Sequence, residues 1–275
     1  MIIAQITDTH IRDGGVRAYG RVDTVAHLAD AVAAIAGLAP PADAVIVTGD
    51  LVDAPTADAY DRFRALVAPL AMPVLPLPGN HDGTAAFAHA FADRGVPDPA
   101  RRDGDLAYAA EIGALRLVML DSTVPGAPHG LMTDDRLRRL DALLAGAPAR
   151  PTIVALHHPP FATGIRHMDA MNCRNGGALE AVLARHPQVL ATVAGHVHRS
   201  IATTFAGRAA SIAPSPAHAV SLALAPDAPA TFHMEPPGLH LHVWDPDGGP
   251  FGRLVTHLVP IGLYPGPHAF AAATD

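Results

Sequence analysis

The chain has little that is typical of a secreted, membrane-spanning or nucleic-acid-binding protein. Its 275 residues include one cysteine, Cys173, which excludes an intrachain disulfide framework and fits a reducing cytoplasm. No apolar run approaches the roughly 18 residues of a membrane span without proline, glycine or charge. The formal charge of −7 argues against a nucleic-acid polymer as partner, because such binders normally carry a basic face. Met1 leads into an apolar stretch without the basic start of a signal peptide, so we expect a cytoplasmic protein.

Two common catalytic motifs are also missing. The sequence has no Gly-x-Ser-x-Gly elbow, which excludes a serine hydrolase of that kind. Gly14-Gly15 lacks the Gly-Lys-Ser/Thr that completes a phosphate-binding loop. Apolar residues nevertheless make up 49% of the chain, which is enough to bury a full core.

Short apolar runs alternate with amphipathic segments along most of the chain. The apolar runs predict strands over residues 2–7, 44–48, 74–77, 106–112, 115–120, 152–156, 189–194, 239–244 and 253–259. The amphipathic segments predict helices over residues 23–38, 56–70 (with Thr56 as N-cap), 84–94, 134–145 and 177–185. This alternation is typical of an α/β fold. Residues 201–257 are rich in proline and glycine and contain no clear helix, while the strand at 253–259 is expected to return to the core sheet.

Five polar motifs stand where predicted strands end, which is where ligands bind in α/β sheets. They are Asp8-Thr9-His10, Gly49-Asp50, Gly79-Asn80-His81-Asp82, His157-His158-Pro159-Pro160 and Gly195-His196-Val197-His198. Two residues apart on an extended strand, Asp8 and His10 would point the same way, as would His196 and His198. The motifs together predict a two-metal hydrolase site.

The residue types explain this prediction. Two divalent cations about 3.5–4 Å apart can share a carboxylate and clamp both oxygens of a displacement at phosphorus. Asp50 suits the shared position, and the neutral oxygen of Asn80 keeps the site from repelling a phosphate ester. Nitrogen and oxygen ligands suit Mn, Fe, Zn or Co, and the lack of nearby cysteine argues against a closed structural zinc site. Taken singly, each of these residues could instead be a turn or capping residue.

The motifs, in this order, resemble the calcineurin-like metallophosphoesterase family, whose pattern is D-x-H, G-D, G-N-H-[DE], H-x-P and G-H-x-H. The segment Tyr19-Gly20-Arg21-Val22-Asp23 brings the resemblance closer to class III cyclic-nucleotide phosphodiesterases and bacterial binuclear glycerophosphodiesterases. The matched motifs span residues 8 to 198. The resemblance implies a four-layer αββα sandwich with a small β-rich cap after the core.

The family pattern also implies a ligand set. It places Asp8, His10, Asp50 and His198 around the first metal, and Asp50, Asn80, His157 and His196 around the second. In H-x-P the first histidine is the ligand, so His157 is preferred to its neighbour His158. Asp53 and Asp82 are expected to hold the ligand loops.

Further roles are expected for several residues of the site and of the C-terminal third. His81 is expected to donate a proton to the leaving alkoxide or to touch the phosphate, the alternative being that it only orients its loop. The resemblance implies that His218 reaches the substrate from the cap. Because the C-terminal third contains many histidines, the alternative is that His218 is one of several surface histidines. His240 and His242 are interpreted as cap or interface residues. Asn80 is counted among the substrate-binding residues as well.

The expected activity is hydrolysis of small phosphodiesters, namely 3′,5′-cyclic nucleotides, glycerophosphodiesters or both, by a metal-bound hydroxide. The alternatives are a phosphomonoesterase of the same family and a metal-binding regulatory protein with little turnover. We expect residues 1–200 to form the catalytic core, 201–265 the returning strands with a cap and oligomerisation segment, and 266–275 a flexible tail. A homodimer or an assembly of dimers is expected, because exposed strand edges invite pairing.

Overall fold

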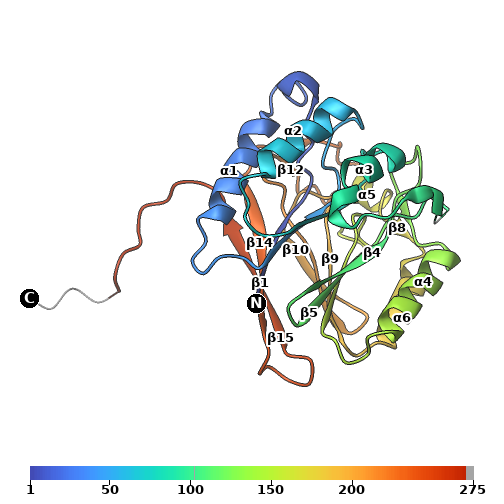
Figure 1. Cartoon of the computed structure of the whole chain (residues 1–275). Helices are drawn as coiled ribbons and strands as arrows, with labels where there is room; N and C mark the ends of the chain where they lie inside the picture. The colour runs from blue at the N-terminus through green and yellow to red at the C-terminus, as the bar shows by residue number, and fades with distance from the viewer. Residues whose placement is uncertain (102, 271–275) are drawn as a thin grey trace, which may run out of the picture.

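Two β-sheets form the centre of the computed structural model, which describes residues 1–101 and 103–270 (Figure 1). The first sheet has the strand order β15 (Arg253–Pro260), β14 (Gly238–Asp245), β1 (Ile2–Ile6), β2 (Ala44–Thr48), β3 (Val74–Leu77). The second has the order β10 (Ile201–Phe205), β11 (Arg208–Ile212), β9 (Val189–Ala194), β7 (Thr152–Ala155), β5 (Leu115–Met119), β4 (Tyr108–Ile112). Strands β1, β2 and β3 are parallel, as are β5, β7 and β9, so their carboxyl ends meet at one edge.

Helices cover the outer face of each sheet (Figure 1). The first sheet carries α1 (Thr24–Ala36), α2 (Ala57–Val67) and α3 (Thr84–Ala90), and the second carries α4 (Asp134–Ala145) and α6 (Gly176–Ala184). The short elements are η1 (Asp13–Gly15), η2 (Ala92–Arg94), η3 (Pro99–Arg101), β6 (Gly130–Leu131), α5 (Arg166–Asp169), β8 (Cys173–Arg174), β12 (Ala219–Val220) and β13 (Phe232–His233). The four layers confirm the predicted αββα sandwich. None of the helices within the described ranges is both long and apolar enough to cross a membrane.

The sequence predicts the start of α2 correctly but not the end of α3. Thr56 caps α2 as predicted, its hydroxyl accepting a hydrogen bond from the Ala59 amide at 3.3 Å. The helix predicted over residues 84–94 instead ends at Ala90. Phe91 leaves the helical region with φ −123° and ψ 21°, and the chain continues as the 3₁₀ turn η2. The apolar pattern of the sequence continues past Ala90, so the sequence pattern does not indicate where the helix ends.

The hairpin β10–β11 was not predicted as strands. Its turn, Ala206-Gly207, has positive φ at both positions, as tight hairpin turns require. Most of β10 is exposed, so it lacks the apolar run that marks a buried strand. Because β11 pairs in parallel with β9, the hairpin extends the second sheet.

A buried hydrogen-bonded glutamine ties the two sheets together below the strand ends. Gln5 of β1 is fully buried, and its Nε2 donates to Thr48 Oγ1 of β2 (2.9 Å) and to the Ala194 carbonyl of β9 (3.0 Å). Its Oε1 accepts from His242 Nε2 at 2.9 Å, and His242 Nδ1 accepts from the Thr256 hydroxyl at 2.8 Å. Thr48 and Ala194 directly precede two of the polar motifs. The hydrogen bonds of Gln5 therefore fix the distance between the two strand ends that carry these motifs.

The interpretation of His240 and His242 as cap or interface residues is wrong. Both lie on β14 inside the first sheet, with relative exposures of 3% and 0%. His240 Nε2 is hydrogen-bonded to the Ser200 hydroxyl at 2.9 Å. His240 and His242 are two residues apart on β14, so both side chains point to the same, buried face of the sheet and not to a cap or interface surface.

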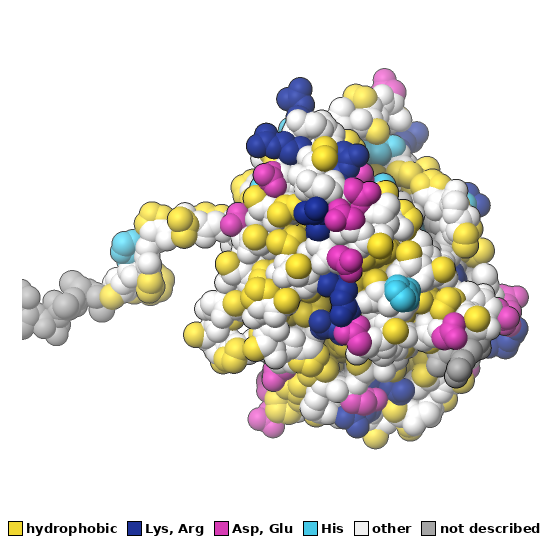
Figure 2. Space-filling view, turned by 45° about the horizontal axis from the view of Figure 1, so that its top comes forward, with side chains coloured by type: hydrophobic (Ala, Val, Ile, Leu, Met, Phe, Trp, Pro, Cys, Tyr) yellow, Lys and Arg dark blue, Asp and Glu magenta, His cyan; other side chains and the backbone are white. Residues whose placement is uncertain are grey.

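The molecular surface and the C-terminal segment complete the description. On the face shown in Figure 2, arginine and acidic side chains are interspersed rather than gathered into one basic patch. Beyond Ile261 the described chain extends away from the sandwich as coil with exposed side chains (Figure 1). Of the tail predicted over residues 266–275, residues 271–275 lie outside the described residues.

Candidate metal centre

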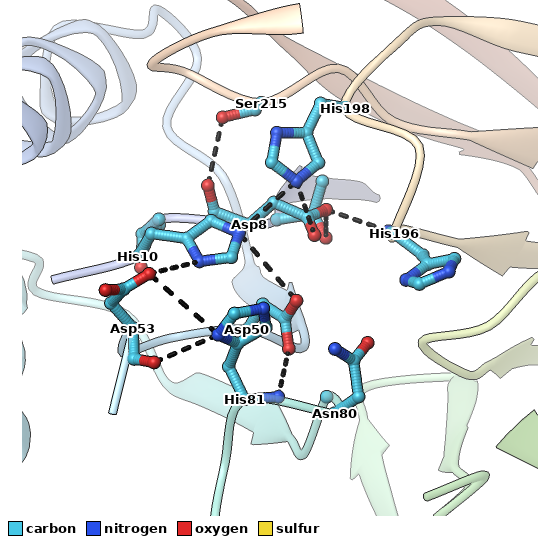
Figure 3. Close-up of polar contacts among 12 residues, drawn as sticks. Asp8, His10, Asp50, Asp53, Asn80, His81, His196, His198 and Ser215 are labelled. Atoms are coloured by element: carbon cyan, nitrogen blue, oxygen red, sulfur yellow. Dashed lines mark hydrogen bonds and ion pairs between the residues drawn. The ribbon is translucent and has the colours of Figure 1, made fainter. Parts of the chain in front are cut away.

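All seven predicted ligand side chains converge at the shared edge of the two sheets, and Figure 3 shows six of them, Asp8, His10, Asp50, Asn80, His196 and His198. They follow β1 (Asp8, His10), β2 (Asp50), β3 (Asn80), β7 (His157) and β9 (His196, His198). The first sheet thus supplies the oxygen ligands together with one imidazole, and the second sheet supplies the other three imidazoles. The site exists only where the two sheets meet.

Ligand atoms gather on two sides of the Asp50 carboxylate. On one side, Asp50 Oδ2 lies 3.7 Å from His10 Nε2, and His198 Nε2 lies 3.3 Å from His10 Nε2 and 3.2 Å from Asp8 Oδ1. On the other side, the same Asp50 oxygen lies 3.4 Å from His157 Nε2, which is 3.2 Å from Asn80 Oδ1. Asp50 is therefore placed to be shared between two cations.

The far nitrogens of His157 and His198 are held by backbone carbonyls, which decides which nitrogen of each ring faces the centre. His157 Nδ1 donates to the Thr48 carbonyl at 2.8 Å, and His198 Nδ1 donates to the His218 carbonyl at 3.2 Å. His10 Nδ1 faces Asp53 Oδ1 at 3.6 Å. Such contacts fix the tautomer and direct the Nε2 lone pair inward, as at protein metal sites.

Most of the inward-facing atoms are hydrogen-bond acceptors that have no donor beside them. Such atoms suit cations, so their arrangement tests whether metal ions fit the site. In neutral rings with Nδ1 protonated, the Nε2 lone pairs of His10 and His198 face each other at 3.3 Å. His196 Nε2 is buried without a hydrogen-bond partner in the described chain. Buried acceptors that are left unpaired are costly, whereas divalent cations would satisfy them. The residues therefore fit a two-metal centre.

Charge interactions keep the carboxylates ionised. Burial alone raises the pKa of Asp50, but the neighbouring His157 outweighs it and holds the pKa well below its usual range. Burial likewise raises the pKa of Asp8, and His198 reverses the shift. Burial lowers the pKa of His196 to about 3, so its ring stays neutral and can act as a ligand. Burial also disfavours the charged form of His157, yet Asp50 raises its pKa to about 9, and a bound cation would displace that proton.

The backbone differs from the extended geometry assumed for the paired motifs. Asp8, His10, Asp50, His196 and His198 all have positive φ, between 43° and 73°. This left-handed region is uncommon for residues other than glycine, and each such residue costs about 1–3 kcal/mol. The motif pairs converge because the strands end in these tight turns, so the extended-strand argument for their direction is wrong.

Two glycines are required by close approach. A β-carbon at Gly79 would collide with Asp50, and one at Gly195 would collide with Thr7 and Asp8. Their motifs therefore begin with glycine because the strand ends pack directly against the carboxylates.

Hydrogen bonds to the loops hold the carboxylates and their neighbours. Asp8 Oδ2 accepts from the His196 amide (2.9 Å) and the Thr7 hydroxyl (2.7 Å), which leaves Oδ1 for the centre. Asp82 accepts from the amides of Leu51 (3.2 Å) and Gly79 (2.9 Å), so it joins two ligand loops. These contacts agree with the supporting role expected for Asp82.

Asp53 lies on the other side of the His10 ring. It forms an ion pair with Arg12 at 3.1 Å and lies 3.9 Å from His81 Nδ1. The interaction with the nearby His10 ring lowers the pKa of the Asp53 carboxyl. The charge on Asp53 thus supports two histidines of the site.

His81 lies next to Asp50 and Asp53 (Figure 3). Its amide donates to Asp50 Oδ1 at 2.9 Å, and its Nδ1 donates to the Asp53 carbonyl at 2.9 Å. Burial lowers the pKa of the ring, but the charges of Asp50 and Asp53 and the hydrogen bond to the Asp53 carbonyl together outweigh it, so the net shift is upward. The remaining nitrogen, Nε2, is free to meet a substrate in the cavity that His81 lines.

A cavity of about 500 Å³ opens onto the centre. Its wall includes Asp50, Asn80, His81 and His218, together with Val220 and Phe232 from the strands β12 and β13. The ring of His218 is buried, 4.6 Å from that of His198 between centroids, and its Nδ1 has no hydrogen-bond partner in the described structure. Burial lowers the pKa of His218 to about 3, so its ring is neutral.

Several residues of the site were not found from the sequence. Ser215 donates to the Asp8 carbonyl at 2.9 Å, and Tyr19 lines the cavity from the loop after β1. Ser122 Oγ lies 2.8 Å from His158 Nδ1, which holds that ring edge-on against His157. Of these, only Tyr19 lies in a segment with a recognisable pattern; the others become visible only through contacts between distant segments.

Comparison with known proteins places these findings in context. The family model described as calcineurin-like phosphoesterase matches residues 1–200. The chain is 36% identical to the probable glycerophosphodiester phosphodiesterase GpdQ of Arcobacter nitrofigilis, covering 98% of this chain and 97% of that protein. It is 35% identical to the 3′,5′-cyclic adenosine monophosphate phosphodiesterase CpdA of Escherichia coli K12, covering 78% and 75%.

Solved structures agree at the level of the fold. A dimetal phosphatase from Danio rerio superposes with a TM-score of 0.63 at 17% identity, covering 95% of this chain and 99% of that one. The sequence match, the shared sandwich and the converging motifs lead to one conclusion: the chain belongs to the calcineurin-like phosphoesterase family.

Proposed function

We propose that this protein is a metal-dependent phosphodiesterase that hydrolyses 3′,5′-cyclic nucleotides, glycerophosphodiesters or both. One observation carries the proposal: a single Asp50 oxygen lies between two groups of inward-facing acceptors, one around His10 and one around His157. The names of the relatives, a glycerophosphodiester and a cyclic-nucleotide phosphodiesterase, support the substrate class.

The two groups of acceptors correspond to two cation positions. Asp8, His10, Asp50 and His198 would hold the first cation, and Asp50, Asn80, His157 and His196 the second. Manganese, iron, zinc and cobalt all suit these ligands. When bound, the cations would supply Lewis acidity and lower the pKa of water at the site.

The side chains around the centre have roles that follow from their positions. His81 Nε2 faces the cavity, and the raised pKa of the ring favours the doubly protonated form, which could give its Nε2 proton to the departing alkoxide while Nδ1 donates to the Asp53 carbonyl. The unpartnered Nδ1 of His218 offers a hydrogen-bonding group at the cavity wall. The amide of Asn80 borders both the centre and the cavity, which supports a role in binding substrate as well as metal.

A comparison of two chromogenic substrates tests the proposed reaction. With added Mn²⁺ we expect higher kcat/KM for bis(p-nitrophenyl) phosphate than for p-nitrophenyl phosphate, and loss of both activities with a chelator. A preference for the monoester would favour a phosphomonoesterase. Turnover of neither substrate by metal-loaded protein would favour a regulatory metal-binding protein and contradict the proposal.

We also propose that the chain forms a homodimer or an assembly of dimers. The edge strand β15 exposes Val255 and Leu258, and the segment after it exposes Leu263 and Tyr264. Bare strand edges with apolar side chains favour pairing. Light scattering on dilute, reduced protein is expected to give at least twice the chain mass of 28.4 kDa. A clean monomer at micromolar concentration would contradict this assignment.

The remaining proposals concern partners and compartment. The acidic net charge and a cavity of about 500 Å³ suit a small diester rather than a nucleic-acid polymer. Cys173 is buried and free, which suits a reducing cytoplasm. The division into a core over 1–200 and a cap and oligomerisation segment over 201–265 is retained as a proposal.

A further inference from the structure

Three aromatic rings form a cluster at the mouth of the cavity, beyond the metal ligands. The Tyr19 and Phe232 ring centroids lie 5.0 Å apart with an interplanar angle of 34°. His218 meets both rings edge-on, at 5.5 Å from Tyr19 and 5.2 Å from Phe232. All three residues line the cavity, so the cluster joins its outer wall to the histidines of the centre.

The fold holds Tyr19 at this position at some cost. Its φ is +52°, a region that a bulky side chain rarely adopts, and 56% of the residue is exposed. The loop is closed by the Ala18 amide, which donates to the Val22 carbonyl at 2.9 Å. Ala18 and Val22 pack with Ala217, and Phe232 packs against them. Strained, exposed aromatic residues at a cavity mouth are typical of binding sites.

The neighbouring wall is apolar and almost free of charge. Pro128, Met168, Met171 and Val220 line it, and Asp50 is the one carboxylate among the described lining residues. Tyr19 and Phe232 are packed against each other, so they offer an outer flat surface rather than a box that encloses a cation. A flat aromatic group fits this surface better than glycerol or a charged amine.

Resting on the phosphodiesterase function proposed above, we propose that Tyr19 and Phe232 determine specificity by stacking with the substrate. They select diesters that carry a nucleobase or another flat aromatic group over diesters whose substituents are small and aliphatic. The phosphate is then held at the centre while the aromatic group lies against the ring of Tyr19.

A matched pair of substrates isolates the stacking contact. 3′,5′-Cyclic AMP and methyl β-ribofuranoside 3′,5′-cyclic phosphate have the same reacting ring, but only the first has a base. We expect Tyr19→Ala to lower kcat/KM for cyclic AMP about tenfold, mostly through KM, because loss of base stacking typically costs that much or more. The value for the compound without a base should change less than twofold.

Two control variants separate stacking from other effects. Tyr19→Phe should retain the preference for cyclic AMP, and Phe270→Ala, which removes an exposed aromatic side chain of the C-terminal segment, should change kcat/KM for neither substrate. Equal losses for both cyclic substrates in Tyr19→Ala would overturn the proposal. A loss confined to glycerophosphocholine would also overturn it, because the rings would then bind a trimethylammonium group.

A binding measurement keeps this inference distinct from the proposed activity. Calorimetry on Mn²⁺-loaded protein compares AMP with ribose 5-phosphate. We expect AMP to bind about tenfold more tightly in the wild type, with the difference lost in Tyr19→Ala. If wild-type protein turned over no diester but kept this difference, the phosphodiesterase proposal would fail and the stacking surface would stand. Equal affinities in the wild type would exclude the stacking surface whatever the activity.

Discussion

Replacing Asp50 by alanine is expected to release at least one of the two cations and to lower turnover by orders of magnitude. Asp50 Oδ2 lies 3.7 Å from His10 Nε2 in one group of ligands and 3.4 Å from His157 Nε2 in the other, and neither imidazole can supply a shared carboxylate oxygen in its place. Metal content measured after dialysis, together with kcat on bis(p-nitrophenyl) phosphate, checks this result. Full occupancy with nearly normal turnover in the alanine variant would refute the assignment of two metals.

The control for this experiment must preserve the backbone. Asp50 has φ +50°, where alanine is strained but asparagine is tolerated. Asp50→Asn should therefore fold with little loss of stability and retain one cation while weakening the other. Asp135→Ala removes an exposed carboxylate of α4 and should change neither metal content nor turnover. Thermal unfolding of each variant separates loss of metal from loss of fold.

His81→Ala is expected to give the second largest effect, a loss of turnover of about 10²–10⁴-fold with metal content unchanged. The reason is that His81 lies beside Asp50 but leaves Nε2 for the substrate. An alkoxide needs a proton in order to leave, whereas p-nitrophenolate does not. The loss should therefore shrink for p-nitrophenyl esters and be largest for alkyl diesters.

The dependence on the leaving group distinguishes two roles for His81. If the loss were equal for p-nitrophenyl and alkyl esters, His81 would position the substrate and the proton-donor role would be wrong. His89→Ala serves as a matched control, because His89 is an exposed histidine of the nearby helix α3. It should leave kcat unchanged for both kinds of ester.

The sequence predicted the parts of the fold that repeat a local pattern. The strands that lead to Asp8, Asp50 and His196 are short and mostly apolar, so their buried positions and their ends were visible without a structure. The convergence of seven ligands followed from polar motifs at those ends. Local periodicity is sufficient here because parallel strands bring their carboxyl ends to one edge.

Features that depend on contacts between distant segments were not predictable in the same way. Gln5 and His242 are 237 positions apart in sequence, and nothing near either residue indicates the hydrogen bond between them. The contact of Tyr19 with Phe232 depends equally on how two loops meet. The left-handed backbone at the ligands is imposed by the packing of the strand ends, since aspartate and histidine do not require it.

The meeting of the two sheets at the site has a consequence for folding. Gln5 and the ligand loops span both sheets, so the complete ligand set exists only after the sandwich has assembled. A cation held by both sheets binds the native state and not the unfolded chain, which makes free metal concentration a variable of the folding equilibrium. At 100 times the dissociation constant, such linkage adds about 2.7 kcal/mol to the free energy of unfolding. That stabilisation is comparable to the strain of one or two left-handed ligand residues, so the cations and the turns that present them offset each other.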